Sequence, residues 1–245
     1  MIRLCLNSRS SSITSLLLLA VSLFSPRLAA EVPLRTFIAS YDLYQDGQHI
    51  AVAQLSLQSS DELWRWRMTT KARGIYALFI SKSPYSETAF MQYDNDIQLQ
   101  QIVIRDSTDQ NKHESANFDW NKGSVAVLRR GKQKQLPLTA EVYDYNSIHL
   151  LTAAMYLRQL NSTTVDFYRK GKLVKSRVVY SGEENVDING EPIDALVYEQ
   201  LIVSSNSKIK YYYDANNPLL PLRIEKLESG EGPTTLTLRE VNWDL

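Results

Sequence analysis

The chain has 245 residues and carries no net charge, with 27 Lys and Arg residues against 27 Asp and Glu residues. This balance excludes the strongly basic surface that nucleic-acid-binding proteins need, so we expect no nucleic-acid partner. Hydrophobic residues make up 44% of the chain, which is more than a disordered protein contains.

The first part of the chain has the organisation of a secretory signal peptide. Arg3 and Arg9 precede the apolar run Ile13–Phe24, and small residues end the segment. A run of about a dozen residues is shorter than the roughly 20 that cross a bilayer. We therefore expect residues 1–30 to be removed, leaving a single domain over residues 31–245 in the periplasm that spans no membrane. An uncleaved N-terminal anchor is the alternative.

The single cysteine, Cys5, lies in this predicted signal peptide, before its apolar run. It does not occupy the position of a lipidated cysteine, which follows such a run. The mature protein would contain no disulfide and no cysteine-based metal site or nucleophile. A chain without thiols is unaffected by an oxidising compartment, which agrees with export.

Short strands separated by turns follow one another along the rest of the chain. Phe37–Tyr44 reads as a strand that ends at Asp46-Gly47, a pair typical of β-hairpins. Residues 51–58 alternate apolar and polar side chains, and residues 64–69 alternate Trp or Met with Arg or Thr. Such alternation indicates strands with one buried face. Further turns at short intervals predict about ten strands in an antiparallel meander.

One segment, residues 144–160, has helical spacing instead, with Ile148 and Met155 on one apolar face. Asp144 or Asn146 would cap its start. One helix and many antiparallel strands bury their apolar faces most economically when a curved sheet wraps around the helix. The expected fold is therefore mostly β, a single curved antiparallel sheet or open β-barrel around one main helix. Barrels of this size can enclose a cavity.

Several short motifs occur in an order typical of one family. They are Tyr41-Asp42-Leu43-Tyr44, Asp46-Gly47, residues 51–57, residues 70–78, Phe118-Asp119-Trp120, Tyr143–Ser147, Tyr212-Tyr213-Asp214 and residues 220–225. Together they resemble the DUF3108 family of exported bacterial proteins over nearly the whole predicted mature chain. The resemblance implies an antiparallel β fold similar to the curved half-barrels of the LolA and LolB lipoprotein carriers. It implies no set of catalytic residues.

A cavity lined by aromatic rings is the main functional prediction. Aromatic rings suit apolar ligands, and the polar tips of Tyr and Trp suit headgroups. The candidate ligand-binding residues are Trp64, Trp66, Tyr76, Phe79, Tyr85, Phe90, Met155, Tyr211 and Tyr213. We expect a non-enzymatic carrier or accessory factor of the cell envelope that binds a lipid or another apolar or amphiphilic molecule without a cofactor. The alternative is that these side chains only fill the core.

Two basic turns indicate a second class of function. One contains Arg129, Arg130 and Lys132, and the other contains Lys172 and Lys175. Such side chains can contact anionic lipid headgroups or acidic glycans, or only protect hairpin edges against pairing. On this hypothesis the protein is an envelope scaffold that docks on a protein partner or a surface through a sheet edge or the basic hairpins.

A hydrolase acting on envelope polymers is the third hypothesis. Ser147 and His149 are two positions apart and do not face each other on a helix. The sequence has neither a G-x-S-x-G elbow nor an HExxH pair, and we assign no catalytic residue and no metal site. Glu87, Glu199 and Glu225 lie in predicted strands and would be the candidates for a pair of facing glycosidase carboxylates.

Overall fold

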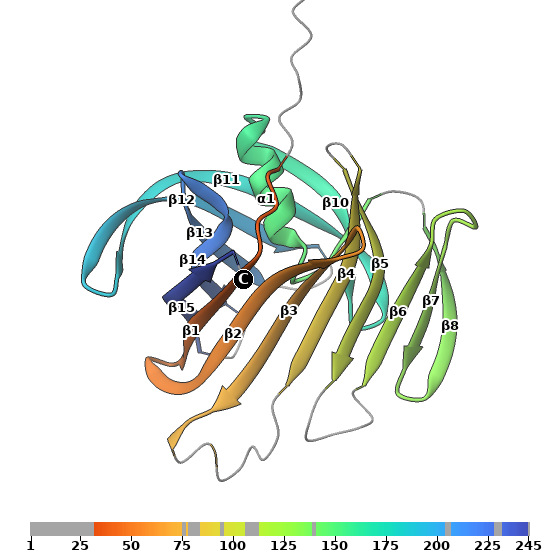
Figure 1. Ribbon diagram of the computed structural model, residues 1–245, viewed down its shortest axis with the longest axis horizontal. Coiled ribbons are helices and arrows are strands. Elements are labelled where there is room, and N and C mark those ends of the chain that lie inside the picture. The colour runs from red at the N-terminus through yellow and green to blue at the C-terminus, as the bar shows by residue number, and fades with distance from the viewer. Residues whose placement is uncertain are drawn as a thin grey trace, which may run out of the picture.

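The computed structural model describes residues 32–74, 77, 84–93, 96–105, 113–138, 141–203, 207–227 and 232–244. Within these ranges, 15 strands form a single sheet in the order β8-β7-β6-β5-β4-β3-β2-β1-β15-β14-β13-β12-β11-β10-β9. Figure 1 shows this sheet rolled around one helix, α1, which lies on its concave side. The predicted signal peptide, residues 1–30, lies outside the described residues.

The strands and the helix have the following bounds. They are β1 (Phe37–Gln45), β2 (Gln48–Ser60), β3 (Leu63–Ala72), β4 (Tyr85–Tyr93), β5 (Asp96–Arg105), β6 (Glu114–Asp119), β7 (Ser124–Arg129), β8 (Lys132–Pro137), β9 (Val142–Tyr143), α1 (Ile148–Leu157), β10 (Ser162–Arg169), β11 (Lys172–Ile188), β12 (Glu191–Ile202), β13 (Lys208–Asp214), β14 (Asn217–Leu227) and β15 (Thr234–Trp243). Every pair of neighbouring strands is antiparallel except β9 and β10, which run parallel. The predicted fold class is confirmed, and the sheet does not close into a barrel.

Tight two-residue turns explain why the chain forms a meander. Their central residues both have positive φ, the backbone conformation of the turns whose twist matches antiparallel strands. Glycine adopts this conformation without steric cost, and four of these turns place a glycine second. They are Asp46-Gly47, Arg130-Gly131, Lys170-Gly171 and Asn189-Gly190, whereas the β2–β3 turn takes the same conformation with Asp61-Glu62.

The alternating segments have one buried face, as predicted. In β2, Ala53, Leu55 and Leu57 are buried, and their cross-strand neighbour Trp66 in β3 is fully buried. Intervening side chains of β3, including Arg67, lie on the outer face of the roll. The inner face packs against α1, where Ile148 through Met155 are all buried. Apolar burial of this kind stabilises a domain by roughly 1.5–3 kcal/mol for each large side chain.

The helix is shorter than the predicted span of residues 144–160. It begins at Ile148, with Ser147 as its N-cap residue, and Gln159 beyond its end takes a positive φ of 54°. Asp144 and Asn146 are therefore not the N-cap residues. The Asp144 carboxylate nevertheless accepts the backbone N–H of Ser147 at 2.8 Å, which gives the turn before the helix a local partner. Local hydrogen bonds of this kind draw residues 144–147 into a turn instead of a helix.

The two ends of the sheet meet through side chains, without a hydrogen-bonded strand pair. The buried Glu114 of β6 accepts the backbone N–H of Gly171 at 2.7 Å and pairs with Arg129 of β7 at 2.6 Å. Nearby, the rings of Phe118 and Tyr168 meet edge to face with centroids 6.4 Å apart. We call this contact between the β10–β11 turn and β6–β7 the seam.

The close approach at the seam predicts an unequal cost for two matched substitutions. Gly131 and Gly171 have nearly the same φ, +70° and +72°, but a Cβ at Gly171 would lie 3.0 Å from Cδ of Arg129, whereas none of the described atoms lies within 4 Å of one at Gly131. Gly171→Val should therefore lower the free energy of unfolding by about 1–3 kcal/mol more than Gly131→Val, because only the first overpacks the seam. Urea denaturation measures the free energy of unfolding of both variants. Equal losses of this free energy would contradict the close packing at the seam.

Candidate functional site

The inward-facing aromatic residues form a packed cluster around His149 of α1. The His149 ring stacks on Trp66 with centroids 5.0 Å apart and meets Tyr211 edge to face. Its Nδ1 lies 2.8 Å from the Tyr213 hydroxyl. Trp66, Phe90, Tyr211 and Tyr213 are each at most 2% exposed, so these four predicted ligand-binding side chains fill the core in this arrangement.

The other predicted ligand-binding residues are dispersed. Trp64 is half-buried against the core, and Met155 is buried on α1, beside a small hollow at the end of the helix. Tyr85, expected on the inner face, lies on the outer face, where its hydroxyl donates to Glu87 at 2.6 Å. Tyr85 shares this face with Glu87, which lies two residues further along β4. Tyr76 and Phe79 lie outside the described residues.

A buried polar cluster fixes the start of α1 against β4. The Asp144 carboxylate accepts hydrogen bonds from the hydroxyls of Thr88 and Ser147, and the amide of Asn146 donates to Thr88 at 3.0 Å. Burial raises the pKa of the Asp144 carboxyl, and these hydrogen bonds partly offset the rise. Because all four side chains are buried and paired with one another, the cluster holds the helix in place.

The geometry gives no catalytic pair around the helix. The Ser147 hydroxyl donates to Asp144 at 2.7 Å, whereas His149 is bonded to Tyr213, so the two side chains are held by different partners. The three candidate carboxylates each have a basic partner: Arg65 and Arg67 for Glu87, Lys208 for Glu199, and Arg223 for Glu225. Burial opposes ionisation of Glu87, but hydrogen bonds from Tyr85 and Arg67 outweigh it and lower the pKa. No described cluster of three His, Cys, Asp or Glu residues is arranged to hold a metal ion.

The two basic turns predicted from the sequence lie side by side. Their glycines, Gly131 and Gly171, are 40 positions apart in the chain, yet a Cβ on Gly171 would touch Val127 and Arg129 at the base of the other turn. We call residues 129–132 and 169–172 the paired basic turns. The seam positions them, because Glu114 bonds both the backbone of one turn and Arg129 of the other.

The predicted surface cations fall into two groups. Arg129 pairs with Glu114, and Lys175 pairs with Asp166 at 2.8 Å, so an anion balances each of these charges. Four other cations of the paired basic turns are exposed and have no anionic partner in the part of the chain that the structure describes. These are Arg130, Lys132, Lys170 and Lys172.

Exposed apolar residues flank the paired basic turns on both sides. Leu128, 42% exposed, precedes Arg129 on the outer face of β7. On the other side, Val203 is 74% exposed, and its backbone N–H donates to the carbonyl of Lys175 at 3.1 Å. Leu201, near the end of β12, and Leu227, at the end of β14, are exposed as well. The site therefore combines unbalanced positive charge with exposed apolar side chains.

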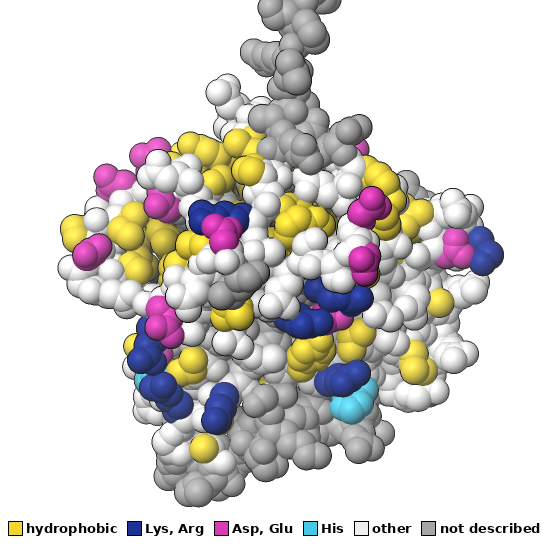
Figure 2. All heavy atoms as spheres, viewed as in Figure 1, with side chains coloured by type: hydrophobic (Ala, Val, Ile, Leu, Met, Phe, Trp, Pro, Cys, Tyr) yellow, Lys and Arg dark blue, Asp and Glu magenta, His cyan; other side chains and the backbone are white. Residues whose placement is uncertain are grey.

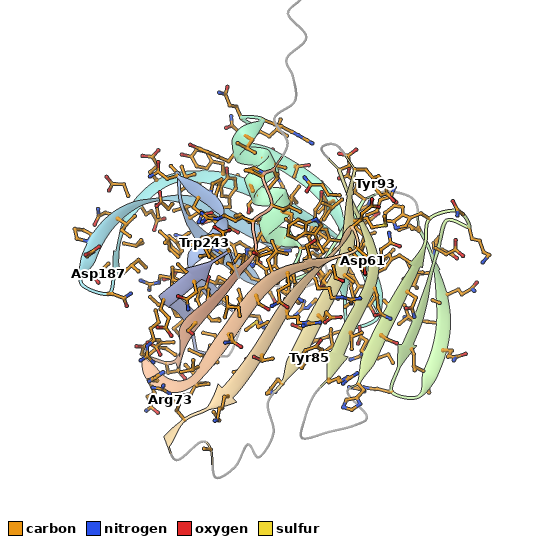
Figure 3. The ribbon with its side chains drawn as sticks, in the orientation of Figure 1. Asp61, Arg73, Tyr85, Tyr93, Asp187 and Trp243 are labelled. Carbon is orange, nitrogen blue, oxygen red and sulfur yellow. The ribbon has the colours of Figure 1, made fainter. Side chains whose placement is uncertain are left out.

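The paired basic turns belong to a generally basic end of the roll. On the face shown in Figure 2, most Lys and Arg side chains lie in the lower half and most Asp and Glu side chains lie in the upper half. Arg73 marks the lower end of the strands in Figure 3, and Tyr93 marks the upper end. The paired basic turns lie at the same lower end, because the strand register aligns Ile104 of β5 with Glu114 of β6, and Glu114 with Arg129 of β7. On the face shown in Figure 2, charge is thus separated along the strand direction.

Sequence reasoning identified the basic residues but missed their convergence. The turns come from hairpins at opposite ends of the sheet order, and only the rolling of the sheet brings them together. The glycine in each basic turn was the one local sign of tight packing, and nothing in the sequence distinguished Gly171 from Gly131. No helix in the described part of the chain has the length and apolarity needed to cross a membrane.

The buried His149 predicts a specific pH dependence of stability. Burial lowers its pKa to about 3, whereas an unfolded histidine has a pKa near 6.5. Below pH 6.5 only the unfolded chain gains this proton, so the free energy of unfolding should fall by about 1.4 kcal/mol per pH unit on account of His149. Urea denaturation at several pH values from pH 6 to pH 4 measures this fall. The free energy of unfolding of His149→Gln should fall less steeply with decreasing pH than that of the unmodified protein. If this variant does not fold, NMR of the native protein should find His149 neutral at pH 5. A protonated ring there would contradict the prediction.

Three solved structures align with most of this chain. A beta-barrel-like protein of domain of unknown function DUF1849 from Brucella abortus aligns with a TM-score of 0.54 at 10% identity, over 86% of this chain and 98% of that one. The MucA/MucB complex of Pseudomonas aeruginosa gives 0.37 at 13% identity, over 89% and 55% of the two chains. A Bacteroides fragilis NCTC 9343 protein with a YmcC-like fold gives 0.33 at 7% identity, over 85% and 96%. The first likeness shows a shared fold, and the two scores below 0.5 carry no argument.

The sequence itself gives the family. No curated protein matches the chain. The family model described as protein of unknown function (DUF3108) matches residues 40–239, which includes every strand from β2 to β14 and the helix. The predicted resemblance is confirmed, and this chain belongs to the DUF3108 family.

Proposed function

We propose that this protein is a non-enzymatic component of the cell envelope that is exported to the periplasm and docks on an anionic lipid surface through the paired basic turns. The observation that carries the proposal is the contact between Gly171 and Arg129, which joins two cationic turns into one surface. Of the functions considered from the sequence, docking through the basic hairpins has the most direct geometric support.

Electrostatic attraction supplies the first part of the argument. Each Lys or Arg close to an anionic membrane contributes about 1 kcal/mol. The four unpaired cations of the paired basic turns would together contribute roughly 4 kcal/mol by this measure, and salt would weaken the attraction. Arg129 and Lys175 add little, because Glu114 and Asp166 already balance them.

The flanking apolar residues favour a lipid surface over a soluble acidic polymer. Leu128 directly precedes Arg129, and Val203 is hydrogen-bonded to Lys175, three residues beyond Lys172; their side chains are 42% and 74% exposed. Peripheral membrane proteins combine basic residues with apolar side chains that enter the boundary between headgroups and acyl chains. An acidic glycan would attract the same cations but would leave these apolar side chains in water.

The packed interior agrees with a surface function. Residues 148–155 of α1 are buried inside the roll, and the rings around His149 occupy the space beside them. A guest molecule there would have to displace Trp66 or Tyr213, both of which are fully buried. The roll therefore serves as a rigid frame for its outer surface.

Charge reversal at the two turn tips tests the proposal. Arg130→Glu and Lys172→Glu should each weaken binding to vesicles of phosphatidylglycerol and phosphatidylethanolamine about tenfold or more, and the double variant should abolish binding at physiological salt. Co-sedimentation with the vesicles measures the effect. Both side chains are exposed, so folding should not change.

Arg239→Glu is the matched control, because Arg239 is an exposed cation on β15, away from the paired basic turns. It should bind the vesicles like the unmodified protein. The proposal fails if the unmodified protein does not bind anionic vesicles, or if the control loses as much binding as the turn variants. Tighter binding to a soluble acidic glycan than to vesicles would also count against it.

A second candidate function is uptake of a single apolar group at the end of the helix. A hollow of about 240 Å³ lies there, and Met155, Tyr156, Leu196 and Tyr198 contribute to its wall. This volume is below the roughly 300–1,000 Å³ of usual ligand sites, so it suits one acyl tail or one ring. The observation in its favour is that Met155 and Leu196 lie beside the rings of Tyr156 and Tyr198 in its wall.

Filling this hollow tests the second candidate. Ala215 is exposed at its rim, and Ala215→Trp should block the hollow without entering the core. If the hollow binds an acyl tail, the variant should lose most of the affinity for a fluorescent fatty acid, measured by titration. Ala126→Trp places the same ring on β7 and should bind normally. Equal binding by both variants would exclude this hollow as the site.

A further inference from the structure

The outer face of the sheet carries a groove that the lipid-docking proposal does not use. It has a volume of about 600 Å³ and lies over β4 to β8. Its wall includes Gln98, Gln100, Asn117 and Gln135, and we call it the amide groove. The alternation of β5 shows that it lies outside the roll, because Leu99, between Gln98 and Gln100, is fully buried. We propose that the amide groove binds an uncharged oligosaccharide.

The side-chain amides provide the chemistry for recognising sugar hydroxyls. Each amide offers two N–H donors and a carbonyl acceptor in one plane, which matches the donor and acceptor pairs that neighbouring hydroxyls present. Asn117 is already oriented, because its Oδ1 accepts a 2.9 Å hydrogen bond from Gln101. The amides of Gln98 and Gln135 have no side-chain partner among the described residues, so they are available to a ligand.

Two aromatic side chains border the amides. Tyr93 is 47% exposed, and it lies at the end of β4, where Figure 3 labels it. Trp120 is half-buried, and its indole N–H donates to the carbonyl of Leu99 at 2.8 Å, which fixes the ring at the groove wall. The apolar face of a pyranose ring packs well on such an amphipathic ring, while its hydroxyls reach polar neighbours.

The charge of the groove favours an uncharged ligand. Asp119 and Lys122 are the two charged residues of its wall, and they pair with each other at 2.6 Å. Neither is left to attract an ion. Among the described residues of this groove's wall, an anionic lipid or nucleic acid would find no unbalanced cation, whereas hydroxyl groups would find several amides.

The shape of the surface favours a chain of sugars over a single sugar. A second hollow of about 390 Å³ lies alongside and shares Asn117, Ala126 and Gln135 with the amide groove. The two together form an elongated track across β6, β7 and β8. Lys134 is the one charged residue in the wall of the second hollow. The small side chain of Ala126 leaves the middle of the track open.

Tryptophan fluorescence and calorimetry with defined oligosaccharides test this proposal. We expect the full-length protein to bind tetramers of N-acetylglucosamine or of glucose, with affinity that does not change with salt. Gln98→Ala combined with Gln135→Ala should weaken binding about tenfold, because each substitution removes about one net hydrogen bond. Tyr93→Ala should weaken binding of the same tetramers by a similar factor, and all these side chains lie outside the core.

Gln54→Ala is the matched control, since it removes an exposed amide from the outer face of β2, outside the amide groove. It should bind the tetramers like the unmodified protein. The proposal is overturned if neither tetramer binds at millimolar concentration, or if Gln98→Ala with Gln135→Ala binds as well as the control. Binding of an acidic oligosaccharide alone, or of an extended peptide alone, would also overturn it. Vesicle binding should be unchanged in these variants, so this test is independent of the lipid-docking proposal.

Discussion

The bridge made by Glu114 is the interaction on which the arrangement of the surface depends. The sheet has two free ends, and no ladder of backbone hydrogen bonds joins them in the described residues. One buried carboxylate binds the backbone of the β10–β11 turn and the guanidinium of Arg129 together. A buried carboxylate is stable only when such partners satisfy it, so the contact is specific in position as well as favourable in energy. As a result, two cationic turns that would otherwise repel each other are held side by side.

The interior explains why the roll keeps its shape. The Asp144 cluster fixes the start of α1 to β4, and His149 then inserts among Trp66, Tyr211 and Tyr213. The helix thereby contacts strands from both halves of the sheet. A frame fixed at its centre and at its seam can present groups on its outer surface in constant relative positions, which is what both the lipid-docking surface and the amide groove require.

Much of the fold could be predicted from local sequence patterns. Alternation in β2 and β3 and the Asp46-Gly47 turn depend only on neighbouring residues, and the structure has them as expected. The start of α1 could not be predicted as well, because the buried Asp144 gains Thr88 as a partner 56 residues away. The side of the sheet on which Tyr85 lies was also predicted wrongly, since its inner or outer position depends on the register between β4 and β3.

The candidate sites depended even more on distant contacts. The cations of each basic turn are obvious in the sequence, but their joint surface depends on the seam between the β10–β11 turn and β6–β7. Likewise, Gln98, Asn117 and Gln135 lie in three separate strands and were not considered as a group. Four of the aromatic residues predicted as ligand contacts, Trp66, Phe90, Tyr211 and Tyr213, are part of the core, because burial preference alone does not distinguish a filled interior from a hollow one.

Spin labels at the two turn tips test the central claim most directly. Labels at Arg130→Cys and at Lys172→Cys, each introduced alone into a chain with Cys5→Ser so that three of the four unbalanced cations remain, can be followed by electron paramagnetic resonance as anionic vesicles are added. We predict that both labels lose mobility over the same range of vesicle concentration, while a label at Arg239→Cys stays mobile. Loss of mobility at one turn without the other, or at neither, would contradict a single docking surface formed by the two turns.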